Sequence, residues 1–116
     1  MRSGVYVMLV MVSVMSTAAQ AQPSGFERCA VCHTVTGTSG EQGPSLLGIV
    51  GRAAGALEDF RYSRPMTRSG ITWDETTLNN FLRVPDEVVP GTRMPFEGIE
   101  SDAERAAIIE YLKTLK

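Results

Sequence analysis

Two cysteines and a histidine stand together in Cys29-Ala30-Val31-Cys32-His33, which is the pattern C-x-x-C-H. Two thiols at this spacing can form thioether bonds with the two vinyl groups of one haem, and the adjacent imidazole can bind its iron. Because His33 is the only histidine, a second imidazole from the same chain is excluded as an iron ligand. The motif therefore predicts one haem, attached through Cys29 and Cys32 and ligated by His33.

The cysteine pair has two alternative chemistries. In an exported protein C-x-x-C could form a disulfide, and it also occurs as the redox-active dithiol of thioredoxin-like folds. Such a fold needs a βαβ pattern around the motif, which this sequence lacks. A structural zinc site has four ligands, whereas two cysteines and one histidine supply three. Covalent haem attachment is the favoured interpretation.

A methionine is the favoured ligand for the opposite face of the iron. Only Met66 and Met94 follow the motif. Met94 lies between Pro90-Gly91 and Pro95, where prolines restrict the backbone and glycine permits a sharp turn. It stands on no helix stripe, where core-filling methionines are usual. A thioether favours ferrous iron and raises the reduction potential. Lys, Tyr, water or an open position are the alternatives from the residues alone.

Residues 1–21 are typical of a secretory signal peptide. Arg2 supplies positive charge, Val5 to Met15 is mainly Val, Met and Leu, and Ala19-Gln20-Ala21 is a small-x-small cleavage site. The apolar run falls short of the ~20 residues of a membrane span, so an anchor is the less favoured alternative. We expect cleavage after Ala21, a periplasmic location, and no stable membrane insertion of the mature chain.

The mature chain, residues 22–116, is the length of one small domain. Of 11 Lys and Arg and 13 Asp and Glu, cleavage removes only Arg2, which leaves a formal charge of −3. This balance argues against a nucleic-acid partner, which requires a basic face. So short a chain buries a modest core, to which a haem would add apolar bulk.

Two stretches have helical periodicity. Thr72 and Glu75 have the spacing of a capping box, Pro85 ends the first helix, and its apolar face is Leu78, Phe81 and Leu82. Ser101 and Glu104 form a second capping box, and the last helix has the apolar stripe Ala107, Ile108, Tyr111, Leu112 and Leu115.

The remaining segments predict short elements and loops. We expect a helical turn or two before His33, with Phe26, Ala30 and Val31 on its apolar face, and one turn at Met66 to Arg68. Asp86 to Pro95 is predicted to be an extended loop. No segment has the alternation of a strand. A further set of side chains is expected to line an apolar pocket: Leu46, Leu47, Ile49 and Val50.

Several segments follow the C-x-x-C-H motif in a fixed order: Gly43-Pro44-Ser45-Leu46-Leu47-Gly48, Gly51-Arg52, Tyr62-Ser63, Gly70-Ile71-Thr72-Trp73, Pro90-Gly91-Thr92-Arg93-Met94 and Glu110-Tyr111-Leu112-Lys113. This ordered set resembles class I c-type cytochromes, the small monohaem cytochromes c of bacteria and mitochondria. The resemblance covers nearly all of the mature chain. It implies an all-α cytochrome c fold, with three to five short helices and long loops wrapped around one covalent haem c.

The resemblance also implies roles for single residues. Met94 would be the second iron ligand, and the Pro44 carbonyl would accept the other imidazole N–H of His33. The first and last helices would cross, with Phe26 against the Ile108–Leu112 face. Four side chains would lie near the haem propionates, where a buried carboxylate needs donors: Arg52, Tyr62, Trp73 and Thr92.

The charges depart from those of mitochondrial relatives, which ring the haem edge with lysines. This chain has two lysines, both near the C-terminus. Asp86 and Glu87 precede Met94, and Arg93 is the only base in that loop. A partner with a neutral or positive docking face is therefore expected.

Together these features predict a soluble periplasmic electron-transfer protein, not an enzyme, that carries one electron on a His/Met-ligated haem c between redox partners, as in a respiratory chain. It would be a monomer. The alternatives are a cytochrome subunit permanently associated with a periplasmic dehydrogenase and, less favoured, a haem enzyme or gas sensor with an open sixth position.

Overall fold

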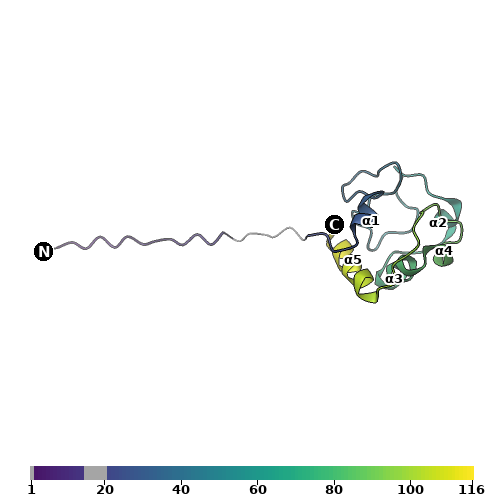
Figure 1. Cartoon of the computed structure of the whole chain (residues 1–116). Helices are drawn as coiled ribbons and strands as arrows, with labels where there is room; N and C mark the ends of the chain where they lie inside the picture. The colour runs from purple at the N-terminus through teal and green to yellow at the C-terminus, as the bar shows by residue number, and fades with distance from the viewer. Residues whose placement is uncertain (1, 15–20) are drawn as a thin grey trace.

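The computed structural model describes residues 2–14 and 21–116, so Ala19 and Gln20 of the predicted cleavage site lie outside the described residues. Residues 2–14 form no helix or strand, and Figure 1 shows them extending away from the folded body. None of the described helices has the length and apolar character needed to cross a membrane. The signal peptide stays a prediction.

The folded part of the described chain contains five helices: α1 Glu27–Ala30, α2 Arg64–Arg68, α3 Glu75–Arg83, α4 Pro85–Val88 and α5 Asp102–Thr114. Long loops join them, and extended pairing within the described residues is limited to an isolated bridge between Ala53 and Thr72. Figure 1 shows these helices and loops arranged around a common centre. The predicted all-α class with short helices and long loops is confirmed.

Helices α3 and α5 pack together and carry much of the core. The predicted face of α3 is buried, and so are the central residues of the α5 stripe. Ala107, predicted to be on that stripe, is exposed, and Ile109 is buried instead. The buried side chains of the two helices are Leu78, Phe81, Leu82, Ile108, Ile109, Tyr111 and Leu112.

The start of α3 differs from the prediction. Its N-cap is Asp74, whose carboxylate accepts the Thr77 N–H at 2.8 Å while the Thr77 hydroxyl accepts the Asp74 N–H at 2.8 Å. Thr72, the predicted cap, lies in the bridge with Ala53. Because that bridge keeps the chain extended up to Trp73, the helix begins two residues later than expected.

Two short helices have a proline in their first turn, Pro65 in α2 and Pro85 in α4. The predicted extended loop after Pro85 is wrong for its first residues, because α4 occupies Pro85–Val88. Proline is favourable at the first helical position, and the acids Asp86 and Glu87 suit a first turn. The turn predicted at Met66 is confirmed as part of α2, which has Ser63 as its N-cap.

Phe26, just before α1, joins the first and last parts of the folded body. Its side chain is fully buried, and its ring lies edge-on to Tyr111 of α5 with 4.8 Å between ring centroids. The predicted contact of Phe26 with the last helix is confirmed. The predicted crossing of the first and last helices is wrong for the described residues, because α5 packs on α3 and not on the short α1. Ala30 and Val31, predicted on the same apolar face, are exposed, and Cys29 is buried in their place.

Candidate functional site

A cavity of about 790 Å³ lies inside the folded body. Every predicted site residue lines it: Cys29, Cys32, His33, Pro44, Arg52, Tyr62, Trp73, Thr92 and Met94. Its apolar walls include Leu46, Ile49, Leu78, Phe81, Leu82, Ile108 and Leu112. Leu47 and Val50, also predicted to line a pocket, are not among the lining residues, and Val50 is 38% exposed. An apolar chamber with two thiols, an imidazole and a thioether at its walls fits a haem.

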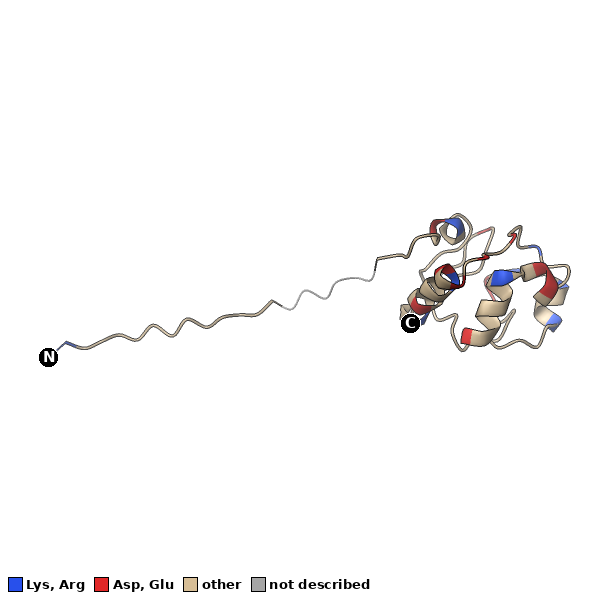
Figure 2. Cartoon of the chain, turned by 60° about the horizontal axis from the view of Figure 1, so that its bottom comes forward, with Lys and Arg blue, Asp and Glu red and all other residues tan. Residues whose placement is uncertain are grey.

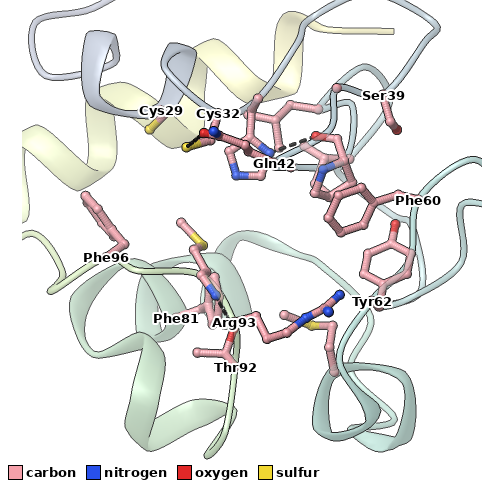
Figure 3. A pocket seen from close by; sticks show the side chains of 18 of the residues that line it. Cys29, Cys32, Ser39, Gln42, Phe60, Tyr62, Phe81, Thr92, Arg93 and Phe96 are labelled. Carbon is pink, nitrogen blue, oxygen red and sulfur yellow. Dashed lines mark hydrogen bonds between the residues drawn. The ribbon is translucent and has the colours of Figure 1, made fainter.

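The C-x-x-C-H motif is positioned by one helical turn. The backbone N–H groups of Cys32 and His33 both donate to the Cys29 carbonyl, at 3.1 and 2.9 Å. Helical bonding therefore continues past α1, which places the three functional side chains at i, i+3 and i+4 on one face. Figure 3 shows both cysteine side chains beside each other at the cavity.

The environment of Cys29 is unlike that of a redox-active thiol. Burial raises the pKa of the Cys29 thiol, although the neighbouring Arg28 acts in the opposite direction. Reactive dithiols depend on a thiol whose pKa is lowered. The site therefore disfavours the dithiol alternative and suits a thiol that is consumed in a thioether bond.

The imidazole of His33 is held in one tautomer. Its Nδ1 lies 2.7 Å from the Pro44 carbonyl oxygen, which can only accept, so Nδ1 carries the proton and Nε2 has a free lone pair. Burial lowers the pKa of His33, partly opposed by this hydrogen bond. A Cβ at Gly43 would lie 2.9 Å from Nδ1 of His33, so glycine is needed for the loop to approach the ring.

Met94 lies on an extended segment. Exposure alternates along it: Met94 and Phe96 pack against the core, whereas Arg93 and Pro95 are exposed. The Met94 N–H donates to the Thr92 hydroxyl at 3.3 Å, and the Phe96 N–H donates to the Met94 carbonyl at 2.9 Å. Met94 thus lies on the side of the segment that lines the cavity.

The chain after Met94 is held by residues of α3 and α5. The Ile99 N–H donates to the Leu82 carbonyl at 2.8 Å. Gly98 has φ +110°, and a Cβ there would also collide with the Arg83 carbonyl oxygen, so this close approach to α3 requires glycine. The Arg105 side chain, 2% exposed, donates to the carbonyl oxygens of Ile99 and Glu100.

Arg105 was missed by the sequence reasoning. Besides the two carbonyls it donates to Asn79 Oδ1 at 2.9 Å and forms an ion pair with Asp102. The sequence does contain an indication that Arg105 is buried, because it lies three residues before Ile108, on the apolar stripe of its helix. A charged residue at such a position is buried only when its donors are satisfied.

The four predicted propionate donors line the cavity but have different partners. Arg52 donates to the backbone carbonyls of Ser45, at 2.8 Å, and Leu47, so it also braces the loop that follows Pro44. The Tyr62 hydroxyl accepts the Leu57 N–H at 3.3 Å, which leaves its own proton free. Trp73, 5% exposed, packs on Phe81 with 5.0 Å between ring centroids.

The charges near the cavity differ from those stressed in the sequence. Asp86 and Glu87 are exposed on α4 and do not line the cavity. Figure 2 shows acidic and basic residues interspersed over the folded body. The charged residues that line the cavity are Arg28, Glu41, Arg52, Asp59, Arg61 and Arg93.

Comparison with known proteins gives a consistent result. A family model described as cytochrome c matches residues 24–116. Cytochrome c2 iso-2 of Magnetospirillum molischianum is 47% identical over 94 residues, which cover 81% of this chain and 97% of the relative. Cytochrome c of Tetrahymena pyriformis is 47% identical over 88 residues, covering 76% of this chain and 79% of the relative.

A solved structure supports the same relationship. Cytochrome cH from Methylobacterium extorquens matches with a TM-score of 0.73 and 40% sequence identity. The match covers 77% of this chain and 90% of that chain. The arrangement of helices and loops around the cavity is therefore shared over nearly the whole of that protein.

Proposed function

The chain belongs to the cytochrome c family, and we propose that it is a soluble periplasmic carrier of single electrons whose haem iron is ligated by His33 and Met94. Family members carry a covalently attached haem c and transfer electrons without acting as enzymes. The same holds for this chain, whose only two cysteines lie in the C-x-x-C-H motif. The haem supplies a reversible one-electron couple.

One observation carries the ligand assignment: His33, with Nδ1 committed to Pro44, and Met94, on the inward side of its segment, line the same cavity. Two protein ligands would keep external molecules from the metal, which suits electron transfer rather than substrate chemistry. Cys29 and Cys32 would form the thioethers. Arg52, Tyr62, Trp73 and Thr92 would donate to the propionates.

The test is the spectrum of the oxidised holoprotein. We expect the wild type to have the sulfur-to-iron absorption band and to bind cyanide slowly, because Met94 must first be displaced. Met94→Ala should lose the band and bind cyanide rapidly. Met66→Ala is the matched control and should retain the band. A wild type that lacks the band, or a Met94→Ala variant that keeps it, contradicts the proposed ligand set.

The location and association of the carrier need separate measurements. We expect the native protein in the periplasmic fraction, with an N-terminus after the predicted signal peptide, and eluting from size exclusion as a monomer. A lasting complex with a periplasmic dehydrogenase would contradict the free carrier and support the dedicated-subunit alternative. The salt dependence of electron transfer with acidic and with basic partner proteins would then define the docking charge.

A further inference from the structure

Two loops meet beside the cavity at the Asp59 carboxylate. The Ser39 N–H donates to Oδ2 of Asp59 at 2.8 Å, and the Ser39 hydroxyl donates to Oδ1 at 2.7 Å. Both residues line the cavity, and Figure 3 shows Ser39 on the side where Phe60, the residue after Asp59, lies. The carboxylate therefore uses both of its oxygens to bind the loop between His33 and Pro44.

The loop that carries Asp59 is braced by contacts of its own. The Leu57 N–H donates to the Tyr62 hydroxyl at 3.3 Å, and the Phe60 ring lies edge-on to Tyr62 with 5.1 Å between ring centroids. The two Ser39 donors hold the pKa of the Asp59 carboxyl below its usual value, so the carboxylate is ionised at neutral pH. Asp59 is therefore a charged acceptor on a braced loop, and hydrogen bonds to a charged acceptor are stronger than those between neutral groups.

The Ser39 hydroxyl also connects this contact to the peptide group between Pro44 and Ser45. It accepts the Ser45 N–H at 2.9 Å, and the Pro44 carbonyl oxygen lies 2.7 Å from Nδ1 of His33. The Pro44 carbonyl and the Ser45 N–H belong to one planar peptide unit. Because that unit is rigid, the hydrogen bond to Ser39 also sets the direction in which the Pro44 carbonyl points at the imidazole.

We propose that Ser39 and Asp59 are positioning residues for His33, because together they orient the peptide group whose carbonyl accepts the imidazole N–H. This inference rests on the proposed function, in which His33 is an iron ligand. A well-aligned hydrogen bond at Nδ1 makes Nε2 a more basic ligand, and a more basic ligand favours ferric over ferrous iron. Release of the peptide group would weaken that bond, expose the Nδ1 proton to exchange with solvent and favour the ferrous state.

The test is the exchange of the His33 Nδ1 proton with deuterium in the reduced holoprotein, followed by proton NMR, together with the reduction equilibrium against a redox mediator. Ser39→Ala removes the hydroxyl without changing the charge. It should speed exchange by roughly fivefold and shift the equilibrium toward the ferrous form by roughly threefold, the size of effect expected from weakening one hydrogen bond. Thr38→Ala, at an exposed neighbour that does not line the cavity, is the matched control and should change neither.

A pair of acid variants tests the role of Asp59. Asp59→Ala and Glu58→Ala each remove one negative charge from an exposed position, but only Asp59 binds Ser39. Asp59→Ala should speed exchange by less than Ser39→Ala does, because the Ser39 hydroxyl can still accept the Ser45 N–H. Glu58→Ala should leave exchange unchanged, and adding Asp59→Ala to Ser39→Ala should speed it little further.

The exchange rates decide the proposal. Equal rates in Ser39→Ala and Thr38→Ala would overturn the role of Ser39, and equal rates in Asp59→Ala and Glu58→Ala would overturn that of Asp59. All of these variants should keep the sulfur-to-iron band, since none of the changes touches Met94. An oxidised wild type without that band would instead reject the proposed function.

Discussion

The two sides of the cavity are built in different ways. On the His33 side, both cysteines and the histidine lie within one helical turn, and the Pro44 carbonyl that orients the imidazole is only eleven residues away. On the Met94 side, the segment has no helix of its own. Contacts from three other elements hold it: Arg28 of α1 and Leu82 of α3 are distant in sequence, whereas Arg105 of α5 follows soon after the carbonyls of Ile99 and Glu100 that it binds.

This difference bears on how each side responds to perturbation. On the His33 side, the hydrogen bonds of one helical turn fix the relative positions of Cys29, Cys32 and His33. An extended segment has no such internal support, so its position depends on the packing of α3 and α5. Segments without regular secondary structure and with few buried side chains open before the core of a domain. Residues 91–98 include no fully buried side chain, and we expect the Met94 side to open first.

The largest expected effect comes from Arg105→Met, which removes the hydrogen bonds that hold the chain after Met94. Its loss leaves the Ile99 and Glu100 carbonyls and Asn79 without their donor, at a cost of about 1–3 kcal/mol for each buried acceptor left unpaired. Urea unfolding should show this loss, and the sulfur-to-iron band should disappear at a lower urea concentration than global unfolding. If the sulfur-to-iron band and the folded structure were lost in one transition, the Met94 side would be as stable as the His33 side.

A matched pair of glycine variants compares the two sides directly. Gly98→Ala forces a side chain against the Arg83 carbonyl at positive φ and should cost about 2–3 kcal/mol. Gly43→Ala places its Cβ 2.9 Å from His33 Nδ1 and should cost about 1–2 kcal/mol. The first should weaken the sulfur-to-iron band, and the second should change the haem spectrum without releasing Met94. If Gly43→Ala released Met94 and Gly98→Ala left the sulfur-to-iron band intact, the two sides of the cavity would not differ as described.

The smallest expected effect concerns Asp74, which caps the helix that carries Leu82. The Thr77 N–H holds the pKa of the Asp74 carboxyl below its usual value. The ionised cap therefore stabilises the fold above the unfolded pKa, and this contribution is lost as the pH falls through the lower folded pKa. Thermal unfolding between about pH 5 and pH 2 should show a steeper loss for the wild type than for Asp74→Asn, whose cap does not titrate. If stability falls equally steeply with pH in the wild type and in Asp74→Asn, ionisation of Asp74 does not contribute to the pH dependence of stability.

The local features of this protein could be predicted from its sequence. The C-x-x-C-H spacing defines one face of a helical turn wherever that turn is placed, so Cys29, Cys32 and His33 were identified together. The apolar residues of α3 and the centre of α5 follow from helical periodicity. Met94 stood out because prolines on both sides of a glycine-containing turn restrict its backbone.

Tertiary contacts decided the rest. Thr72 and Asp74 are both suitable caps, and the bridge from Ala53 to Thr72 determined that Asp74 is used. Val31 is apolar but 78% exposed, whereas Arg105 is charged and buried. Burial depends on which distant segments meet a side chain and on whether its hydrogen bonds are satisfied there. Residue type and spacing describe only the local chain, so the tethering of the Met94 segment was visible only in the folded molecule.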